Sequence, residues 1–298
     1  MKRPAIISLG EVLWDLFPDG EQFGGASANF ACHAAISGGD VTMVSAVGAD
    51  RHGRLAVDIL QGYGIDVSLI QVVPDAATGT VSVELDADGS PTFTIHEGSA
   101  WDRLGWSGQL EVRVLAADAV YFGTLGQRSE ASRLTIRQCI KAASATGIPR
   151  VLDINLRPPF FDSELIRESV QHASILKLSE EELPEVCTAC GIEIGDPPDA
   201  QLRQLLNMNN LHLVVMTRGA EGAVLATADG ILLHPGIPTA VRDTVGAGDA
   251  FTAAFLQGVL RDEPHDKLLH KACVIAAATC AHSGAVPRSQ AAETLPTK

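Results

Sequence analysis

The residues best suited to chemistry in this chain stand in one run near the end of the sequence, residues 243–251. The run reads Asp-Thr-Val-Gly-Ala-Gly-Asp-Ala-Phe and leads into an apolar helical pattern. Gly246, Ala247 and Gly248 leave unpaired N–H groups at a helix start, where the helix dipole also favours an anion such as phosphate. Asp249 stands beside those donors, where a carboxylate would repel a resting phosphate. We therefore expect Asp249 to take a proton from an attacking hydroxyl while the N–H groups hold a transferring phosphoryl group.

A second glycine-rich string, Gly-Gly-Ala-Ser-Ala-Asn-Phe-Ala, occupies residues 24–31 and opens another helical pattern. Gly24 and Gly25 allow the backbone to approach a ligand closely. Asn29 lies one helical turn further and carries both a donor and an acceptor, which suits vicinal hydroxyl groups. Asp15 follows the first expected strand and is either an acceptor for hydroxyl groups or a solvated loop acid.

Together the two strings resemble the two signatures of the ribokinase/PfkB family of carbohydrate kinases, in the family's order and over nearly the whole chain. The resemblance implies an ATP-dependent kinase that transfers the γ-phosphoryl group to a sugar hydroxyl, with Mg²⁺ bridging the β- and γ-phosphates. It also implies that Asp249 is the base and that Asp15 accepts hydrogen bonds from sugar hydroxyls. An ordinary loop with an acidic helix cap is the alternative for residues 243–251.

Further candidate sugar contacts follow other expected strands. The string Asp-Ile-Asn-Leu-Arg-Pro at 153–158 is similar to one found in fructokinases and 2-keto-3-deoxygluconate kinases of the family. Asn155 is therefore a substrate candidate, and Arg157 either contacts substrate and stabilises phosphoryl charge or makes a structural salt bridge. Trp101 either covers an apolar sugar face or packs in the interior. Gln127 is a further candidate for a hydroxyl contact.

The nucleotide side rests on the same resemblance. The string Lys-Leu-Ser-Glu-Glu-Glu at 177–182 is similar to the family's Asn-x-x-Glu motif, with Ser in place of Asn. Glu182 is expected to organise Mg²⁺ through water, with Ser179 and Lys177 near the phosphates. A serine helix cap with a glutamate capping box fits the same spacing. Three residues of the following strand and turn are expected beside the phosphates or ribose: Thr217, Gly219 and Gly222.

Many members of this family bind potassium or a similar ion beside the anion site through backbone carbonyls. Carbonyl ligation leaves almost no side-chain signal, so this expectation rests on the resemblance alone. By position the carbonyls belong to five residues: Asp243, Val245, Thr279, His282 and Gly284.

Strands and helices alternate through most of the sequence, which predicts a doubly wound α/β sheet. Strands are expected near 5–10, 41–47, 119–122, 150–154, 175–178 and 213–217, with a hairpin at 222–226 and 230–234. Helices are expected over 27–37, 53–64, 130–145, 179–187, 250–260 and 266–282. A hairpin at 78–85 and 91–95 interrupts the alternation and, with residues 12–23, predicts a small β-sheet lid spanning about 12–23 and 78–100. Residues 1–298 are thus expected to form a single ribokinase-like domain, a central sheet flanked by helices.

Composition limits the partners. With 298 residues, 46% of them hydrophobic, the chain can bury a large core, and its formal net charge of −14 argues against nucleic-acid or acidic-membrane partners. No apolar run is long enough for a membrane span, and the apolar run near the N-terminus is too short for the core of a signal peptide. We therefore expect a cytoplasmic location. Its six scattered cysteines fit a reducing compartment. The resemblance makes a homodimer through the lid the expected assembly.

Competing enzyme motifs are absent from the sequence. It has no Gly-Lys-[Ser/Thr] of a P-loop, no complete dinucleotide fingerprint, no His-Glu-x-x-His and no Gly-x-Ser-x-Gly. Fructose is the favoured substrate, because Gly10-Glu11, Asp15 with Pro18, and the Asn-x-Arg-Pro string at 155–158 resemble fructokinases.

Four alternatives remain open from the sequence. A 2-keto-3-deoxygluconate kinase would need a cation for its substrate's carboxylate, and three arginines could supply it: Arg157, Arg128 and Arg103. Ribokinase is a further alternative, and a nucleoside kinase would require an aromatic cradle such as Trp14 with Trp101. The fourth is a non-catalytic, sugar-binding regulatory protein on the same scaffold, although a pure binder has no need of a base such as Asp249 beside a phosphate.

Overall fold

A nine-stranded mixed sheet forms the centre of the computed structural model, which describes residues 3–85 and 91–287. Its strands are β1 (Ala5–Leu9), β4 (Asp40–Gly48), β5 (Asp66–Val73), β8 (Ala119–Gly123), β9 (Arg150–Asp153), β10 (Ile175–Ser179), β11 (Leu213–Thr217), β12 (Ala223–Thr227) and β13 (Gly230–His234). They lie in the order β13-β12-β11-β10-β9-β8-β1-β4-β5. Neighbours are parallel from β5 to β11, and β12 and β13 form the predicted antiparallel hairpin at one edge.

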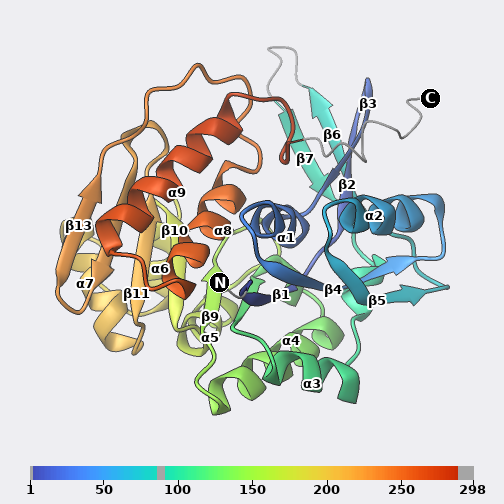
Figure 1. Cartoon of the computed structure of the whole chain (residues 1–298), viewed down its shortest axis with the longest axis horizontal. Helices are drawn as coiled ribbons and strands as arrows, with labels where there is room; N and C mark the ends of the chain where they lie inside the picture. Colours follow the sequence, from blue (N-terminus) through green and yellow to red (C-terminus); the bar gives the residue numbers. More distant parts are fainter. Residues whose placement is uncertain (1–2, 86–90, 288–298) are drawn as a thin grey trace.

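Helices cover both faces of this sheet (Figure 1). One face carries α1 (Ala26–Ile36), α2 (Arg51–Gly62), α8 (Ala247–Leu260) and α9 (His265–Cys280). The other carries α3 (Gly108–Leu115), α4 (Glu130–Ala145), α5 (Ser163–His172), α6 (Leu183–Ala189) and α7 (Pro198–Met208). Side chains alternate across the sheet, so Ile6 packs into one apolar core and Ile7 into the other. The predicted doubly wound α/β architecture is confirmed.

The strand order reverses between β1 and β8. From β1 the chain builds β4 and β5 on one side, and then returns to build β8 to β13 on the other side. In open α/β sheets, ligands bind outside the carboxyl ends of the strands at such a reversal. The loops that follow β1, β8, β9, β10 and β11 all begin at this edge of the sheet.

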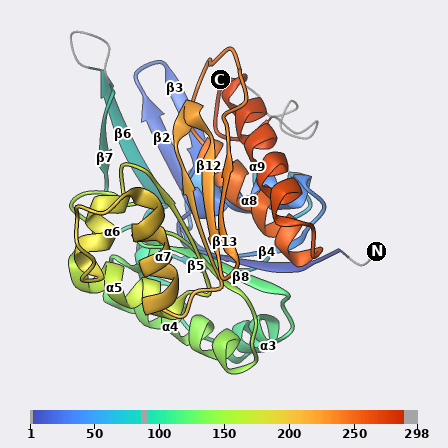
Figure 2. The same cartoon turned by 90° about the vertical axis from the view of Figure 1, so that its left-hand side faces the viewer.

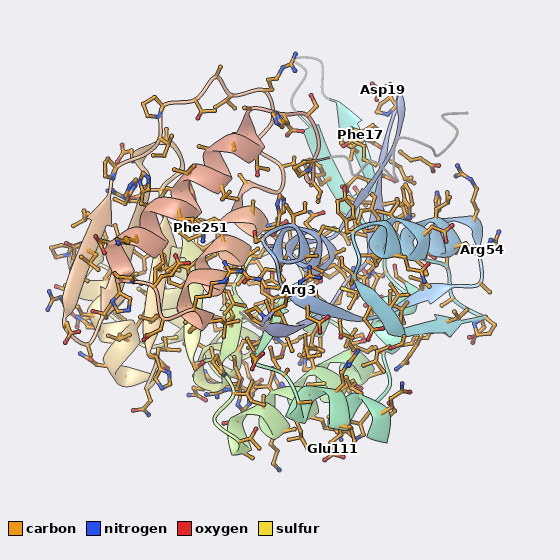
Figure 3. All side chains as sticks on the ribbon, in the orientation of Figure 1. Arg3, Phe17, Asp19, Arg54, Glu111 and Phe251 are labelled. Atoms are coloured by element: carbon orange, nitrogen blue, oxygen red, sulfur yellow. The ribbon has the colours of Figure 1, made fainter. Side chains whose placement is uncertain are left out.

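A separate four-stranded sheet projects beyond this edge (Figure 2). Its strands, in order, are β3 (Gly20–Gly24), β2 (Leu13–Phe17), β6 (Gly79–Leu85) and β7 (Pro91–Ile95). Figure 3 places Phe17 and Asp19 on its outer part. The two segments predicted to form a lid therefore do build one sheet, except that residues 96–100 leave it and residues 86–90 lie outside the described residues. Its action as a lid stays a prediction.

Contacts with α2 hold the small sheet against the main body. Glu21 on β3 forms an ion pair with Arg51 and a hydrogen bond of 2.6 Å with His52 Nε2. The Trp14 indole N–H donates to the carbonyl of His52 at 3.1 Å. The first turn of α2 is therefore the anchor for β2 and β3.

Some elements differ from the sequence expectations. The helix predicted over 179–187 begins only at Leu183, because residues 179–182 form a turn in which the Glu182 carboxylate accepts the N–H of Ser179. No strand or helix was predicted for β5, α3, α5 or α7. None of the described helices is long and apolar enough to cross a membrane.

Candidate active site

The N-terminus of α8 provides free N–H donors at the edge of the sheet. Gly246 precedes the helix in the left-handed conformation, with φ 77°. A Cβ there would lie 2.2 Å from the carbonyl oxygen of Ala285, so only glycine fits this turn. Among the described residues, no acceptor takes the N–H groups of Gly248 and Asp249. The helix begins at Ala247, three residues before the predicted start at Ala250. Within the described chain, its first turn leaves the N–H groups of Gly248 and Asp249 unpaired, whereas the N–H of Ala247, also predicted to be free, donates to the Thr244 carbonyl at 3.3 Å.

Asp249 lies in the first turn of α8 and is 9% exposed. Its Oδ2 accepts a hydrogen bond of 3.0 Å from the Asn29 side chain on α1. Burial, followed by the negative charge of Asp153, raises its pKa to about 7, against the opposing effects of Asn29, Lys177 and Arg157. A carboxyl that titrates near neutral pH is suited to accept a proton from a hydroxyl.

A buried ionic network lies directly behind this turn. Lys177 on β10 donates to Asp153 Oδ1 on β9 at 3.0 Å, and Thr252 on α8 donates to Asp153 Oδ2 at 3.0 Å. Burial lowers the pKa of Lys177, but the charges of Asp153 and Glu182 outweigh that effect and raise it. A Cβ on Gly248 would lie 3.1 Å from the Lys177 ammonium. Lys177 is thus a fixed cation beneath the start of α8.

Two acids follow β1: Glu11 in the connection to the small sheet, and Asp15 on the first strand of that sheet, β2. Asp15 on β2 has a pKa raised to about 6 by burial, with the charge of Arg157 opposing the shift. A Cβ on Gly24 would lie 2.7 Å from Asp15 Oδ2, so the glycine leaves room for this carboxylate. Glu11 is buried and accepts hydrogen bonds from the N–H and hydroxyl of Ser27, at 3.3 and 3.2 Å. Glu11 therefore fixes the start of α1, which carries Asn29.

Gly25 completes that start. It precedes α1 with φ 102°, and a Cβ would lie 2.7 Å from the carbonyl oxygen of Glu11. The close approach of these two segments explains the glycine at this position.

The loop after β9 carries Asn155 and Arg157. Asn155 adopts a left-handed φ of 41°, which turns the chain outward after the strand. The Arg157 guanidinium is exposed and donates to the Leu156 carbonyl at 3.0 Å. No carboxylate forms a salt bridge with it among the residues the structure describes. The positive charge of Arg157 lowers the pKa of both Asp15 and Asp249 and so opposes the effect of burial on each carboxyl.

Two predicted sugar contacts lie in the interior instead. Trp101 is 2% exposed, and the Arg128 guanidinium lies 3.9 Å above its ring. Gln127 is 1% exposed, and its side-chain nitrogen donates to the Gly123 carbonyl and to Ser169 Oγ, each at 3.0 Å. Trp101 therefore occupies the packing position that was its alternative, and the Gln127 side chain is directed towards Ser169 on α5.

On the nucleotide side, Glu182 joins two strand ends. One of its oxygens accepts the N–H of Leu156 at 2.7 Å and the other accepts that of Ser179 at 2.8 Å. This is half of the capping box considered from sequence, although Ser179 does not cap α6 with its side chain. Each carboxylate oxygen retains a lone pair, so Glu182 fits a water-mediated contact with a divalent cation.

The turn after β11 holds the three remaining nucleotide candidates. Thr217 is partly exposed at the end of the strand, and its hydroxyl lies 3.4 Å from the carbonyl of Leu178. Gly219 is exposed with φ 52°. A Cβ on Gly222 would lie 2.1 Å from the carbonyl of His234, so this glycine permits packing of the turn against β13.

The five expected carbonyl donors lie in two neighbouring segments: the turn before α8, and the last turn of α9 together with the turn that follows it. One Asp243 oxygen accepts the N–H of Val245 at 3.0 Å, and the other accepts that of Gly284 at 2.8 Å. The Thr279 carbonyl already accepts the N–H of His282 at 3.1 Å. The two turns thus meet beside the start of α8, where backbone oxygens are suited to a hard monovalent cation.

Comparison with known proteins identifies the family. The model of the pfkB family carbohydrate kinases matches residues 19–292. The chain belongs to this family. It is 29% identical over 276 residues to fructokinase-2 of Zea mays, covering 87% of this chain and 81% of the relative. It is 29% identical over 284 residues to aminoimidazole riboside kinase of Salmonella typhimurium, covering 91% and 86%.

The fold agrees with solved members. A sugar kinase of Pyrococcus horikoshii in complex with ATP superposes with a TM-score of 0.80 at 28% identity, covering 97% of this chain and 99% of that one. Family membership makes this chain a sugar kinase, a phosphotransferase that acts on an alcohol group. The non-catalytic alternative has no support.

Three residues of this PfkB site were missed as candidates from sequence: Glu11, Asp153 and Thr252. Asp153 and Glu11 stood inside strings that were already noted, Asp153 at the end of an expected strand and Glu11 directly after one. Acidic residues at strand ends in a doubly wound sheet were the available signal. Thr252 gave no signal, because its role depends on α8 packing against β9.

Proposed function

We propose that this chain is an ATP-dependent fructokinase. The observation that carries the proposal is the placement of Asp249, a buried carboxyl that titrates near neutral pH beside free N–H donors of α8. That pairing suits phosphoryl transfer to a hydroxyl group, and family membership supplies the sugar as acceptor.

In the proposed reaction, Asp249 takes the proton from a primary hydroxyl of fructose. The hydroxyl oxygen then forms a bond to the γ-phosphorus of ATP, and the bond from that phosphorus to the β–γ bridging oxygen breaks. The N–H groups of residues 246–249 neutralise charge on the transferring group. Arg157, whose charge acts on Asp249, either stabilises the charge on the transferring group or contacts the sugar.

The sugar would lie between α1 and the small sheet. Asn29, Asp15 and the Gly24–Gly25 backbone border this space, and Asn155 lies at the adjacent strand end. We propose that the small sheet acts as a lid that excludes water, which would otherwise hydrolyse ATP. The whole chain, residues 1–298, then works as one ribokinase-like domain, with a homodimer through the small sheet as the proposed assembly and the cytoplasm as the proposed location.

ATP is the proposed phosphoryl donor, in line with the ATP complex of the Pyrococcus horikoshii relative. Its phosphates would lie among Ser179, Thr217, Gly219 and the start of α8, with Lys177 behind them. Mg²⁺ would neutralise the β- and γ-phosphates, with Glu182 holding its water ligands. A monovalent cation, K⁺ in the first instance, would fit the carbonyls of the two turns tied by Asp243.

Fructose is preferred to the other acceptors for reasons of charge and space. A keto-acid needs a free cation, yet Arg128 is buried in a bidentate pair with Asp102, and Arg103 pairs with Asp75 at 2.8 Å. Only Arg157 of the three arginines remains for a carboxylate, which keeps 2-keto-3-deoxygluconate as the second candidate. A nucleoside would need an aromatic cradle, but Trp14 and Trp101 are 6% and 2% exposed.

ATP consumption with Mg²⁺ and K⁺ tests the proposal against fructose, ribose, 2-keto-3-deoxygluconate, tagatose and adenosine. We expect the highest kcat/KM with fructose. A preference for the keto-acid would retain the mechanism and assign Arg157 to carboxylate recognition. Omitting K⁺, or replacing it by Na⁺, tests the cation turns, and loss of turnover is expected. No turnover with any of the five would refute the fructokinase proposal.

A further inference from the structure

Lys177 was placed behind the phosphates of ATP, but its buried partner Asp153 has no role in the reaction described so far. We propose that this buried ion pair, joined to Thr252, is a positioning group that holds the first turn of α8 and sets the charge environment in which Asp249 exchanges its proton. The inference rests on the proposed function, because it assigns the pair a role in phosphoryl transfer by Asp249.

The network links three elements at the carboxyl edge of the sheet. Asp153 is 1% exposed at the end of β9, and each of its oxygens has one partner: Lys177 from β10 and Thr252 from α8, both at 3.0 Å. The Thr252 hydroxyl also lies 2.9 Å from the Gly248 carbonyl, one residue before Asp249. A hydroxyl has a single hydrogen, which either oxygen can take. Thr252 therefore connects Asp153 to the backbone that carries Asp249.

Lys177 cannot act as a mobile surface cation. Its ammonium is held by Asp153 and lies beneath Gly248, where a Cβ would be only 3.1 Å away. A fixed positive charge behind the free N–H groups favours an anion in front of them. The glycine at 248 keeps the backbone close enough for this charge to act through the turn.

The two members of the pair act on Asp249 in opposite directions. The charge of Asp153 raises the pKa of Asp249, whereas that of Lys177 lowers it. Asn29 on α1 donates to Asp249, and the charge of Arg157 in the loop after β9 lowers the pKa of Asp249. The charge of Asp249 in turn raises the pKa of Tyr121 on β8. Removing one member of the pair must therefore shift the titration of Asp249 in a direction fixed by the sign of the lost charge.

The test compares two single substitutions. In Lys177→Met the uncompensated Asp153 carboxylate remains, so the acidic limb of the kcat/KM pH profile should move up by about one pH unit. In Asp153→Asn the lysine remains, so the limb should move down by a similar amount. Thr252→Val keeps both charges, and its limb should stay in place while kcat falls.

Two further variants keep the test decisive. Asp153→Asn with Lys177→Met removes both charges, avoids an unpaired buried ion and should return the limb towards that of the original chain. Lys271→Met removes a lysine that pairs with Glu263 on the surface at 3.1 Å, and should leave the limb unchanged. Shifts in the same direction for both single variants, or no shift in folded proteins, would overturn the inference.

A readout that needs no turnover separates this inference from the proposed function. The ¹³C shift of the Asp249 carboxyl, followed from pH 5 to pH 9 without ligands, reports its titration in each variant. Opposite displacements in Lys177→Met and Asp153→Asn would support the positioning role even if fructose is not phosphorylated. Unmoved titration in an enzyme that phosphorylates fructose would reject the inference alone.

Discussion

Replacing Asp249 by asparagine should stabilise the fold and at the same time strongly reduce turnover. The pKa of Asp249 is raised from 3.8 to about 7 by burial and by Asp153. The folded chain thus binds this proton more tightly than the unfolded chain, so the free energy of unfolding falls as pH rises from about 4 to about 7. Above pH 7 the buried, ionised carboxylate lowers the free energy of unfolding by a nearly constant amount of at most about 4 kcal/mol, since one pKa unit corresponds to about 1.4 kcal/mol.

Asparagine removes this cost because it is neutral at every pH and retains an oxygen for the hydrogen bond from Asn29. The stability advantage of Asp249→Asn should therefore grow by about 2 kcal/mol between pH 5.5 and pH 7, and then remain constant. Turnover should fall by about 100- to 10,000-fold, the usual contribution of a general base.

Urea denaturation at pH 5.5, 7 and 8.5 measures the first effect, and ATP consumption with the preferred sugar measures the second. Asp58→Asn is the matched control, since Asp58 is exposed on α2 and its replacement should leave the pH dependence of stability unchanged. If the gain in stability of Asp249→Asn does not change with pH, then burial of the ionised Asp249 does not destabilise the fold. Unchanged turnover would exclude Asp249 as the base.

The remaining predictions concern packing around the site. Gly246→Ala should destabilise the start of α8 and raise the KM for ATP, because its Cβ would meet the Ala285 carbonyl; calorimetry and kinetics check this. Gln127→Ala should lower the free energy of unfolding, measured by urea denaturation, by about 1–3 kcal/mol and leave the KM for sugar unchanged, because the buried side chain donates its hydrogen bonds to Gly123 and Ser169. Arg128→Met should cost about 3–5 kcal/mol by leaving Asp102 unpaired, and Arg128→Lys should recover only part of it.

The sequence predicted best those features that depend on local backbone geometry. The two glycine strings each imply a tight turn followed by a helix, and both Gly25 and Gly246 adopt positive φ at such a start. The order of strands and helices was enough to predict the doubly wound sheet and the small second sheet. Local patterns also placed Asp249 correctly beside the free N–H groups at the start of a helix.

Side-chain direction was harder to predict, because it depends on packing between distant segments. Trp101 and Gln127 stand near strand ends in the sequence, yet the structure buries one beneath Arg128 and directs the other towards Ser169 on α5. Asp153 was not identified as a site residue for a similar reason, because its partners come from β10 and α8, which are distant in the sequence. Spacing along the chain does not distinguish a side chain that faces the ligand space from one that faces the core.

The balance of charges around Asp249 explains how a base can lie next to a phosphate. In the structure described here, Asp153 and burial hold its proton near neutral pH, while Lys177 and Arg157 oppose them. An arriving phosphate brings further negative charge and raises the proton affinity of a nearby carboxylate. Asp249 thus becomes a stronger base when the donor is in place, provided that fixed cations and N–H groups keep it ionised. The Asp153–Lys177 pair supplies a cation of that kind without a mobile side chain that would compete for the substrate.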